Sequence, residues 1–149
     1  MPDFYGPDGR KLSTAFIIPA PDKSFWCIRR TQGNFNNSGM ISFPGSDGHD
    51  IRAVVEQAQI RLGFITSPQD WKDLGIADNA ANNEWKKAYG YQKGIVIPSR
   101  IPGGHHEKDK YANLMPLSAN KLWELNQTGE LSPAAKSVML MLPMIFGCP

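Results

Sequence analysis

The stretch MISFPGSDGHDIRAVVEQAQIRLGFI, Met40 to Ile65, decides the fold that this sequence predicts. It predicts a strand, a tight turn and one amphipathic helix. The apolar run around Phe43 favours a strand, and Pro44-Gly45 ends it, because proline lacks the N–H that pairs strands and glycine accepts turn dihedrals.

The helix that follows has recognisable limits. Asp47 or Asp50 can cap its first turn, since a short carboxylate accepts hydrogen bonds from free N–H groups. Gly63 stands where a left-handed C-terminal cap is expected. Apolar residues at helical spacing then form one stripe that predicts a buried face: Ile51, Val54, Val55, Ala58 and Leu62.

The residues before this stretch predict a hairpin of two strands, at 13–20 and 24–30, joined by a turn at 21–23. Residues 1–12 are rich in proline, glycine and aspartate and are expected to form an arm. Residues 13–149 then form a single domain, which suits a chain of 149 residues.

The residues after it predict further strands and two helices. A short strand within 66–80 leads to a surface loop at Asp78-Asn79. The segments 84–91 and 92–100 form one or two strands, with Ile95, Val96 and Ile97 buried, and 111–117 forms the last strand. Ser118 caps a helix through about Asn126.

Ser132 caps the final helix, with Pro133 at its first position, where proline fits. Its apolar residues are expected to pack on the sheet: Val138, Leu140, Met141 and Leu142.

The central stretch resembles the Nudix hydrolase family. Phe43-Pro44-Gly45-Ser46 is similar to the family's Phe-Pro-Gly-Gly turn, Ala53-Val54-Val55 to the apolar entry of its helix, and Leu62-Gly63-Phe64 to the exit. The preceding hairpin extends the resemblance over residues 13–65. The resemblance implies an α+β fold, an α/β/α sandwich with a mixed β-sheet, where the order of elements alone gives only α+β or α/β.

The catalytic letters of the family pattern do not match. Its Arg-Glu falls on Glu56-Gln57, and its metal-binding Glu-Glu pair falls on Ile60-Arg61. Mg²⁺ or Mn²⁺ requires clustered oxygen ligands, whereas isoleucine has no donor atom and arginine carries a fixed positive charge. We therefore expect no cofactor, and Mg²⁺ or Mn²⁺ only if the protein is an active hydrolase with rearranged ligands.

Other residues are candidates for such a rearranged site. Glu56 and Glu107 are candidate catalytic residues, and Asp47, His49 and Asp50 are candidate metal ligands. The plainer interpretations are a solvated turn with a helix cap at 47–50 and an exposed charged loop at 105–107.

Basic residues suggest a ligand site. The resemblance implies that a basic residue at the end of the second strand, Arg29 or Arg30, faces the substrate groove. Arginine suits phosphate because its planar fork donates two hydrogen bonds at once. Arg61 and Gln57 on the helix complete the candidate ligand-binding set; the alternative for Arg29 and Arg30 is one exposed side chain and one that packs along the sheet.

Composition narrows the class of partner. The net charge of +2 is too small to predict nucleic-acid binding. The longest apolar run, at 138–147, contains Pro143 and is far shorter than the roughly 20 residues of a membrane span. Two cysteines and no apolar N-terminal segment favour a cytoplasmic protein.

Three functions stay open from the sequence. The first is a catalytically degenerate Nudix-like domain that binds a nucleotide or other phosphate-bearing small molecule. The second is an active hydrolase of nucleoside diphosphate derivatives. The third is a protein-interaction module, with a protein partner or a homodimer.

Overall fold

The strand β1 (Lys11–Ile17) organises the first of two sheets. It pairs in parallel with β7 (Glu84–Tyr91), from Lys11 opposite Glu84 to Ile17 opposite Gly90. It also pairs antiparallel with β5 (Gly45–Asp47), and β6 (Trp71–Asn79) pairs antiparallel with β7. The sheet order β5-β1-β7-β6 is therefore mixed. These relations come from a computed structural model, which describes residues 5–29, 39–47, 50–63, 65–97 and 113–149.

The second sheet is antiparallel and is built around β3 (Ser24–Arg29). Strands β2 (Pro19–Ala20) and β4 (Ile41–Ser42) pair with opposite ends of β3, and β8 (Asn113–Ser118) pairs along its whole length. The β2–β3 turn confirms the predicted hairpin, although β1, which precedes it, belongs to the other sheet.

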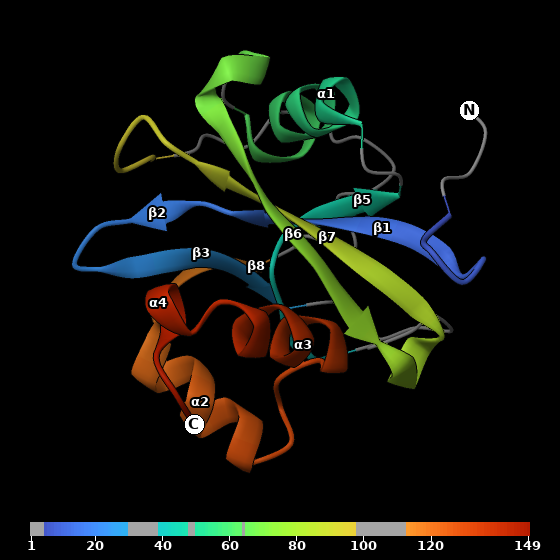
Figure 1. Cartoon of the computed structure of the whole chain (residues 1–149). Coiled ribbons are helices and arrows are strands. Elements are labelled where there is room, and N and C mark those ends of the chain that lie inside the picture. Colours follow the sequence, from blue (N-terminus) through green and yellow to red (C-terminus); the bar gives the residue numbers. More distant parts are fainter. Residues whose placement is uncertain (1–4, 30–38, 48–49, 64, 98–112) are drawn as a thin grey trace.

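Helices cover both faces of the sheets (Figure 1). Helix α1 (Ile51–Leu62) lies on one side, and α2 (Ala119–Gln127), α3 (Pro133–Met141) and α4 (Pro143–Phe146) lie on the other. Short 3-10 helices occur at Pro68–Asp70 and Ala80–Asn82. The α/β/α sandwich with a mixed sheet is thus confirmed. Within the described ranges, no helix is long and apolar enough to cross a membrane.

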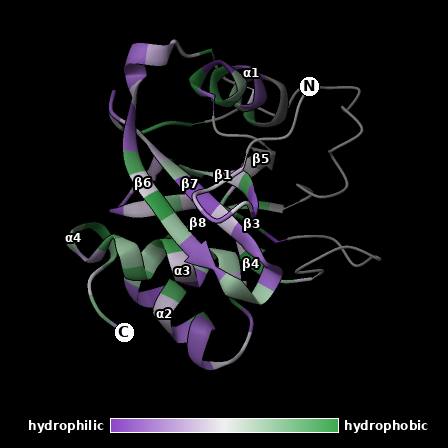
Figure 2. Cartoon of the chain, turned by 45° about the vertical axis from the view of Figure 1, so that its right-hand side comes forward, coloured by the Kyte–Doolittle hydropathy of each residue, from purple (hydrophilic) through white to green (hydrophobic). Residues whose placement is uncertain are grey.

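Alternation along β1 creates a core on each side of the sheet, since successive strand residues point to opposite faces. Ala15 and Ile17 belong to the cluster under α2 and α3, while Phe16 and Ile18 belong to the cluster under α1. Both α1 and α3 carry hydrophobic and hydrophilic residues on the same ribbon, as helices with one packed face do (Figure 2).

The structure corrects the predicted turn at Pro44-Gly45. β4 ends at Ser42, and Gly45 begins β5 in the other sheet, so the segment is a crossover between sheets. The predicted surface loop at Asp78-Asn79 is also wrong: both residues belong to β6, and Asn79 is fully buried.

Two apolar predictions fail for reasons of geometry. Val96 is buried, but Ile95 and Ile97 on either side of it are exposed, so only the middle residue of the three points inward. Leu140 is also exposed, since the buried stripe of α3 runs through Ala135, Val138 and Met139.

Candidate functional site

The crossover from the second sheet to the first positions α1 against the sheets. Phe43 and Pro44 are buried, and the Pro44 carbonyl accepts a hydrogen bond from the Phe16 N–H at 2.8 Å. Gly45 then approaches β1 so closely that a Cβ atom there would overlap the Thr14 carbonyl oxygen. The close approach requires glycine, which explains physically why Phe-Pro-Gly stands here.

Helix α1 begins and ends where the sequence predicts. Asp50 is its N-cap, with the carboxylate accepting from the Arg52 N–H at 2.7 Å. Gly63 has φ of 75° and donates its N–H to the Gln59 carbonyl at 3.2 Å, which closes the last turn. The apolar stripe packs on the sheet, so the candidate site lies on the remaining faces of the helix.

Those faces carry the positions that correspond to the family's Arg-Glu and Glu-Glu pairs, namely Glu56-Gln57 and Ile60-Arg61. Glu56 is exposed, and Gln57 is half-buried. The Gln57 Oε1 atom is itself buried and accepts no hydrogen bond from any residue that the structure describes. Ile60 and Arg61 belong to α1, but their side chains lie outside what the structure describes.

This donor set does not fit a divalent cation of the Nudix type. Mg²⁺ and Mn²⁺ select clustered carboxylates, whereas α1 offers the neutral amide of Gln57, the single carboxylate of Glu56, no donor at Ile60 and a cation at Arg61. Within the described part of the chain, no group of three or more His, Cys, Asp and Glu side chains is placed to hold a metal ion.

The other candidate ligands are not brought together. Asp50 serves as the helix cap, and Asp47 lies in β5 opposite Ser13, with its side chain outside the described set. His49 and Glu107 both lie outside the described residues.

Arg29 is held on the side of the sheets away from α1. Its guanidinium donates to the Gly39 carbonyl at 3.0 Å and lies 3.8 Å from the Glu130 carboxylate, just before α3. Cys27, two residues earlier on β3, belongs to the core under α2 and α3, and alternation puts Arg29 on the same side. Arg30 lies outside the described residues.

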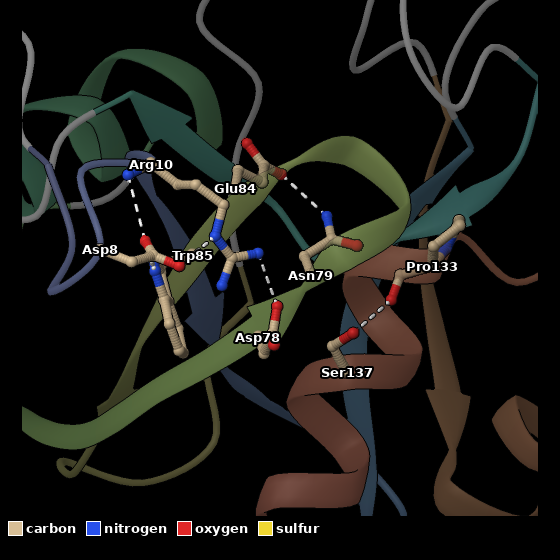
Figure 3. Close-up of polar contacts among 8 residues, drawn as sticks. All are labelled: Asp8, Arg10, Asp78, Asn79, Glu84, Trp85, Pro133 and Ser137. Atoms are coloured by element: carbon tan, nitrogen blue, oxygen red, sulfur yellow. Dashed lines mark hydrogen bonds and ion pairs between the residues drawn. The ribbon is translucent and has the colours of Figure 1, made fainter.

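The structure reveals polar contacts that the sequence did not predict, at the end of the first sheet where β6 turns into β7 (Figure 3). The Trp85 indole N–H donates to Asp8 at 2.7 Å, and the Arg10 guanidinium lies 4.5 Å from the centre of the Trp85 ring. Arg10 also pairs with Asp8 and Asp78. Partners so distant in sequence meet only through the β1–β7 pairing, so no local pattern signals them.

The pKa values of Asp8 and Tyr89, both near this sheet, are shifted from their ordinary values. The hydrogen bond from Trp85 is the main cause that lowers the pKa of Asp8 to about 2. Burial raises the pKa of Tyr89, and the charges of Asp73 and Asp50 raise it further. Tyr89 therefore keeps its proton at neutral pH and acts as a neutral side chain beside the N-terminus of α1.

Comparison with known proteins bears on the fold. No protein-family model matches the sequence, and no curated protein matches it. A MutT protein from Methanosarcina mazei Go1 is similar in structure, with a TM-score of 0.62, 13% identity, and coverage of 90% of this chain and 91% of that chain. A NUDIX hydrolase from Nitrosomonas europaea has a TM-score of 0.57 and 12% identity, covering 89% and 88%.

A third similar structure is the complex between the C-terminal domain of mouse MUTYH and human PCNA. The matching chain has a TM-score of 0.62 and 17% identity, with coverage of 89% of this chain and 87% of that chain. At these levels of identity the similarity establishes the fold alone.

Proposed function

We propose that this chain, which has the Nudix fold, is a catalytically degenerate domain that binds a nucleotide or another phosphate-bearing small molecule and releases it unchanged. One observation carries the proposal. Gln57, Ile60 and Arg61 on α1 stand where the family pattern has glutamates.

Loss of hydrolysis follows from the chemistry of these side chains. A divalent cation that activates water needs several anionic oxygens around it. The guanidinium of Arg61 repels such a cation. The neutral oxygen of Gln57 compensates for little of the hydration that the cation loses on binding. The helix that holds the metal in the family therefore has little affinity for one in this chain.

Retention of a ligand follows from the same replacement. A fixed cation on α1 takes over part of the charge role of a metal ion and holds an anion without activating water. A charge-assisted contact of arginine with phosphate contributes roughly 1.5–3 kcal/mol.

The second basic residue of the proposed site is Arg30. Arg29 was an equal candidate from the sequence, but its guanidinium is engaged by Gly39 and Glu130. We therefore assign Arg30 and Arg61 to the ligand phosphate.

Calorimetry with a panel of nucleotides in EDTA tests the proposal. We expect binding that weakens about tenfold or more in Arg61→Ala, as the loss of one such contact implies. Arg52→Ala is the matched control, because Arg52 is exposed on the same helix, and its binding should equal that of the wild type. No heat with any nucleotide, or binding indifferent to Arg61 and Arg30, would contradict the proposal.

Protein interaction is the second candidate, and the surface of α4 favours it. Phe146 is buried against Phe25 and Phe43, with ring centroids 4.8 and 5.4 Å away, so α4 is held firmly. It nonetheless presents Met144 at 99% exposure, and Leu140 of α3 is also half-exposed. Sedimentation over a concentration range tests for a homodimer, which a Met144→Lys change should dissociate.

Hydrolysis with rearranged ligands is decided by a separate assay. The assay measures turnover of ADP-ribose or a nucleoside triphosphate with Mg²⁺ or Mn²⁺. A rate of about 1 s⁻¹ or faster, which is usual for an enzyme, would show that the chain is an active hydrolase. Such turnover would transfer the catalytic role to Glu56 or Glu107, and alanine changes at Asp47, His49 and Asp50 would then identify the metal ligands.

A further inference from the structure

Asn79 is a fully buried amide whose oxygen has no hydrogen-bond partner among the described residues. The residue ends β6 and is 0% exposed. Its Nδ2 group donates to the Glu84 carboxylate at 2.9 Å, whereas its Oδ1 atom accepts no hydrogen bond. An unpaired buried acceptor costs roughly 1–3 kcal/mol, so this oxygen calls for a donor.

The neighbouring side chains fix the direction of the amide. Glu84 accepts from the Ser13 hydroxyl at 3.1 Å, and the Lys86 ammonium donates to the same hydroxyl at 2.9 Å. Turning the Asn79 amide over would place its oxygen against the Glu84 carboxylate, where two acceptors repel. The donor end therefore faces Glu84, and Oδ1 faces the other way.

The other side is formed by the first turns of α3. In Figure 3 the Asn79 oxygen is turned toward the part of α3 that carries Pro133 and Ser137. The Ser137 hydroxyl donates to the Pro133 carbonyl at 3.0 Å, so its proton is already committed. Three hydrogen-bond acceptors therefore lie on this side: Asn79 Oδ1, Ser137 Oγ and the Pro133 carbonyl. The hydroxyl proton of Ser137 is already donated to the Pro133 carbonyl.

We infer that one buried water molecule is bound between Asn79 and α3. It donates one proton to Asn79 Oδ1 and the other to an acceptor of the first α3 turns, Ser137 Oγ or the Pro133 carbonyl. Buried water molecules make about two to four hydrogen bonds to otherwise unsatisfied groups, and the two donated bonds described here fall within that range. The Lys86 ammonium beside Glu84 already balances the local negative charge, so a neutral guest fits better than a cation.

The water joins the β6–β7 turn to α3, and it is independent of the ligand site on α1. NMR of labelled wild-type protein in buffer without ammonium ions tests it. We expect cross-peaks between water and protons of Asn79 and Ser137, with the opposite NOE and ROE signs that mark a long-lived bound water.

Two variants separate this site from a direct contact. Asn79→Leu should abolish the cross-peaks and raise the unfolding equilibrium constant about tenfold, as the loss of one buried hydrogen bond does. Ser137→Ala, the matched control, should keep the cross-peaks to Asn79, because Asn79 and the Pro133 carbonyl remain. Absence of long-lived water in the wild type would overturn the inference, as would survival of the cross-peaks to Ser137 in Asn79→Leu.

Discussion

A single methyl group added at Gly45 tests how the crossover positions α1. In Gly45→Ala the new Cβ atom would overlap the Thr14 carbonyl oxygen and lie 3.1 Å from the Thr14 carbonyl carbon. These are backbone atoms of β1, which pairs with β7 on its other edge and cannot yield alone. Overpacking costs about 1–3 kcal/mol, and the lower entropy of the unfolded alanine chain offsets about 0.4–1 kcal/mol of it. The net loss of unfolding free energy lies between about 0 and 2.6 kcal/mol, with a middle value of about 1 kcal/mol.

Urea unfolding followed by tryptophan fluorescence measures this loss. With a slope of about 1–3 kcal/mol per molar urea, the middle value corresponds to a fall of the midpoint by up to about 1 M. Gly90→Ala on β7 is the matched control, because its nearest obstacle is Leu74 Cδ1 at 3.0 Å, the end of a flexible side chain. Its midpoint should fall less. Equal midpoints for Gly45→Ala and the wild type would refute the argument from the crossover.

Two further predictions concern the packing of the core under α1 and the loss of stability at low pH. Val54 on α1 is 0% exposed, so Val54→Asp should lower the unfolding free energy by roughly 3 kcal/mol or more. Val55 is only half-buried, so Val55→Asp should lower it by less. Equal urea midpoints for the two variants would show that α1 does not bury Val54. The pKa of Asp8 is lowered from 3.8 to about 2, and the hydrogen bond from Trp85 is the largest cause. The ionised Asp8 therefore contributes fully to the free energy of unfolding above about pH 4, and this contribution is lost as the pH falls toward 2. Trp85→Phe should raise that pKa toward 3.8 in an NMR titration, and an unchanged value would exclude the indole as its main cause.

The sequence predicted the parts of the fold that local chemistry decides. The limits of α1 follow from a capping carboxylate at Asp50 and a left-handed glycine at Gly63, and both act within one turn. Ser118 and Ser132 cap α2 and α3 in the same local way. From the identities of Gln57 and Arg61 we also predict that α1 holds no divalent cation, and this stays a prediction.

Features that depend on long-range pairing were not predictable. The parallel pairing of β1 with β7 brings Ser13 next to Lys86. No local sequence pattern around either residue predicts this contact. The sequence predicts that side chains alternate between the two faces of β3, but it does not predict which face each residue takes. It therefore left open whether Arg29 lies on the side of α1 or on the side of α2 and α3. The same limit applies to Ile95 and Ile97, whose apolar character gave no sign that only Val96 points inward.

The proposed function has two parts: the protein binds a phosphate-bearing molecule without metal, and it leaves that molecule intact. ³¹P NMR of ADP-ribose or a nucleoside triphosphate reports both properties in one sample. We predict that the phosphate resonances shift or broaden when protein is added in EDTA, that Arg61→Ala removes this effect, and that no new phosphate resonance appears after excess Mg²⁺ is supplied. New resonances from hydrolysis at about 1 s⁻¹, or spectra unchanged by the wild-type protein with every nucleotide, would contradict it.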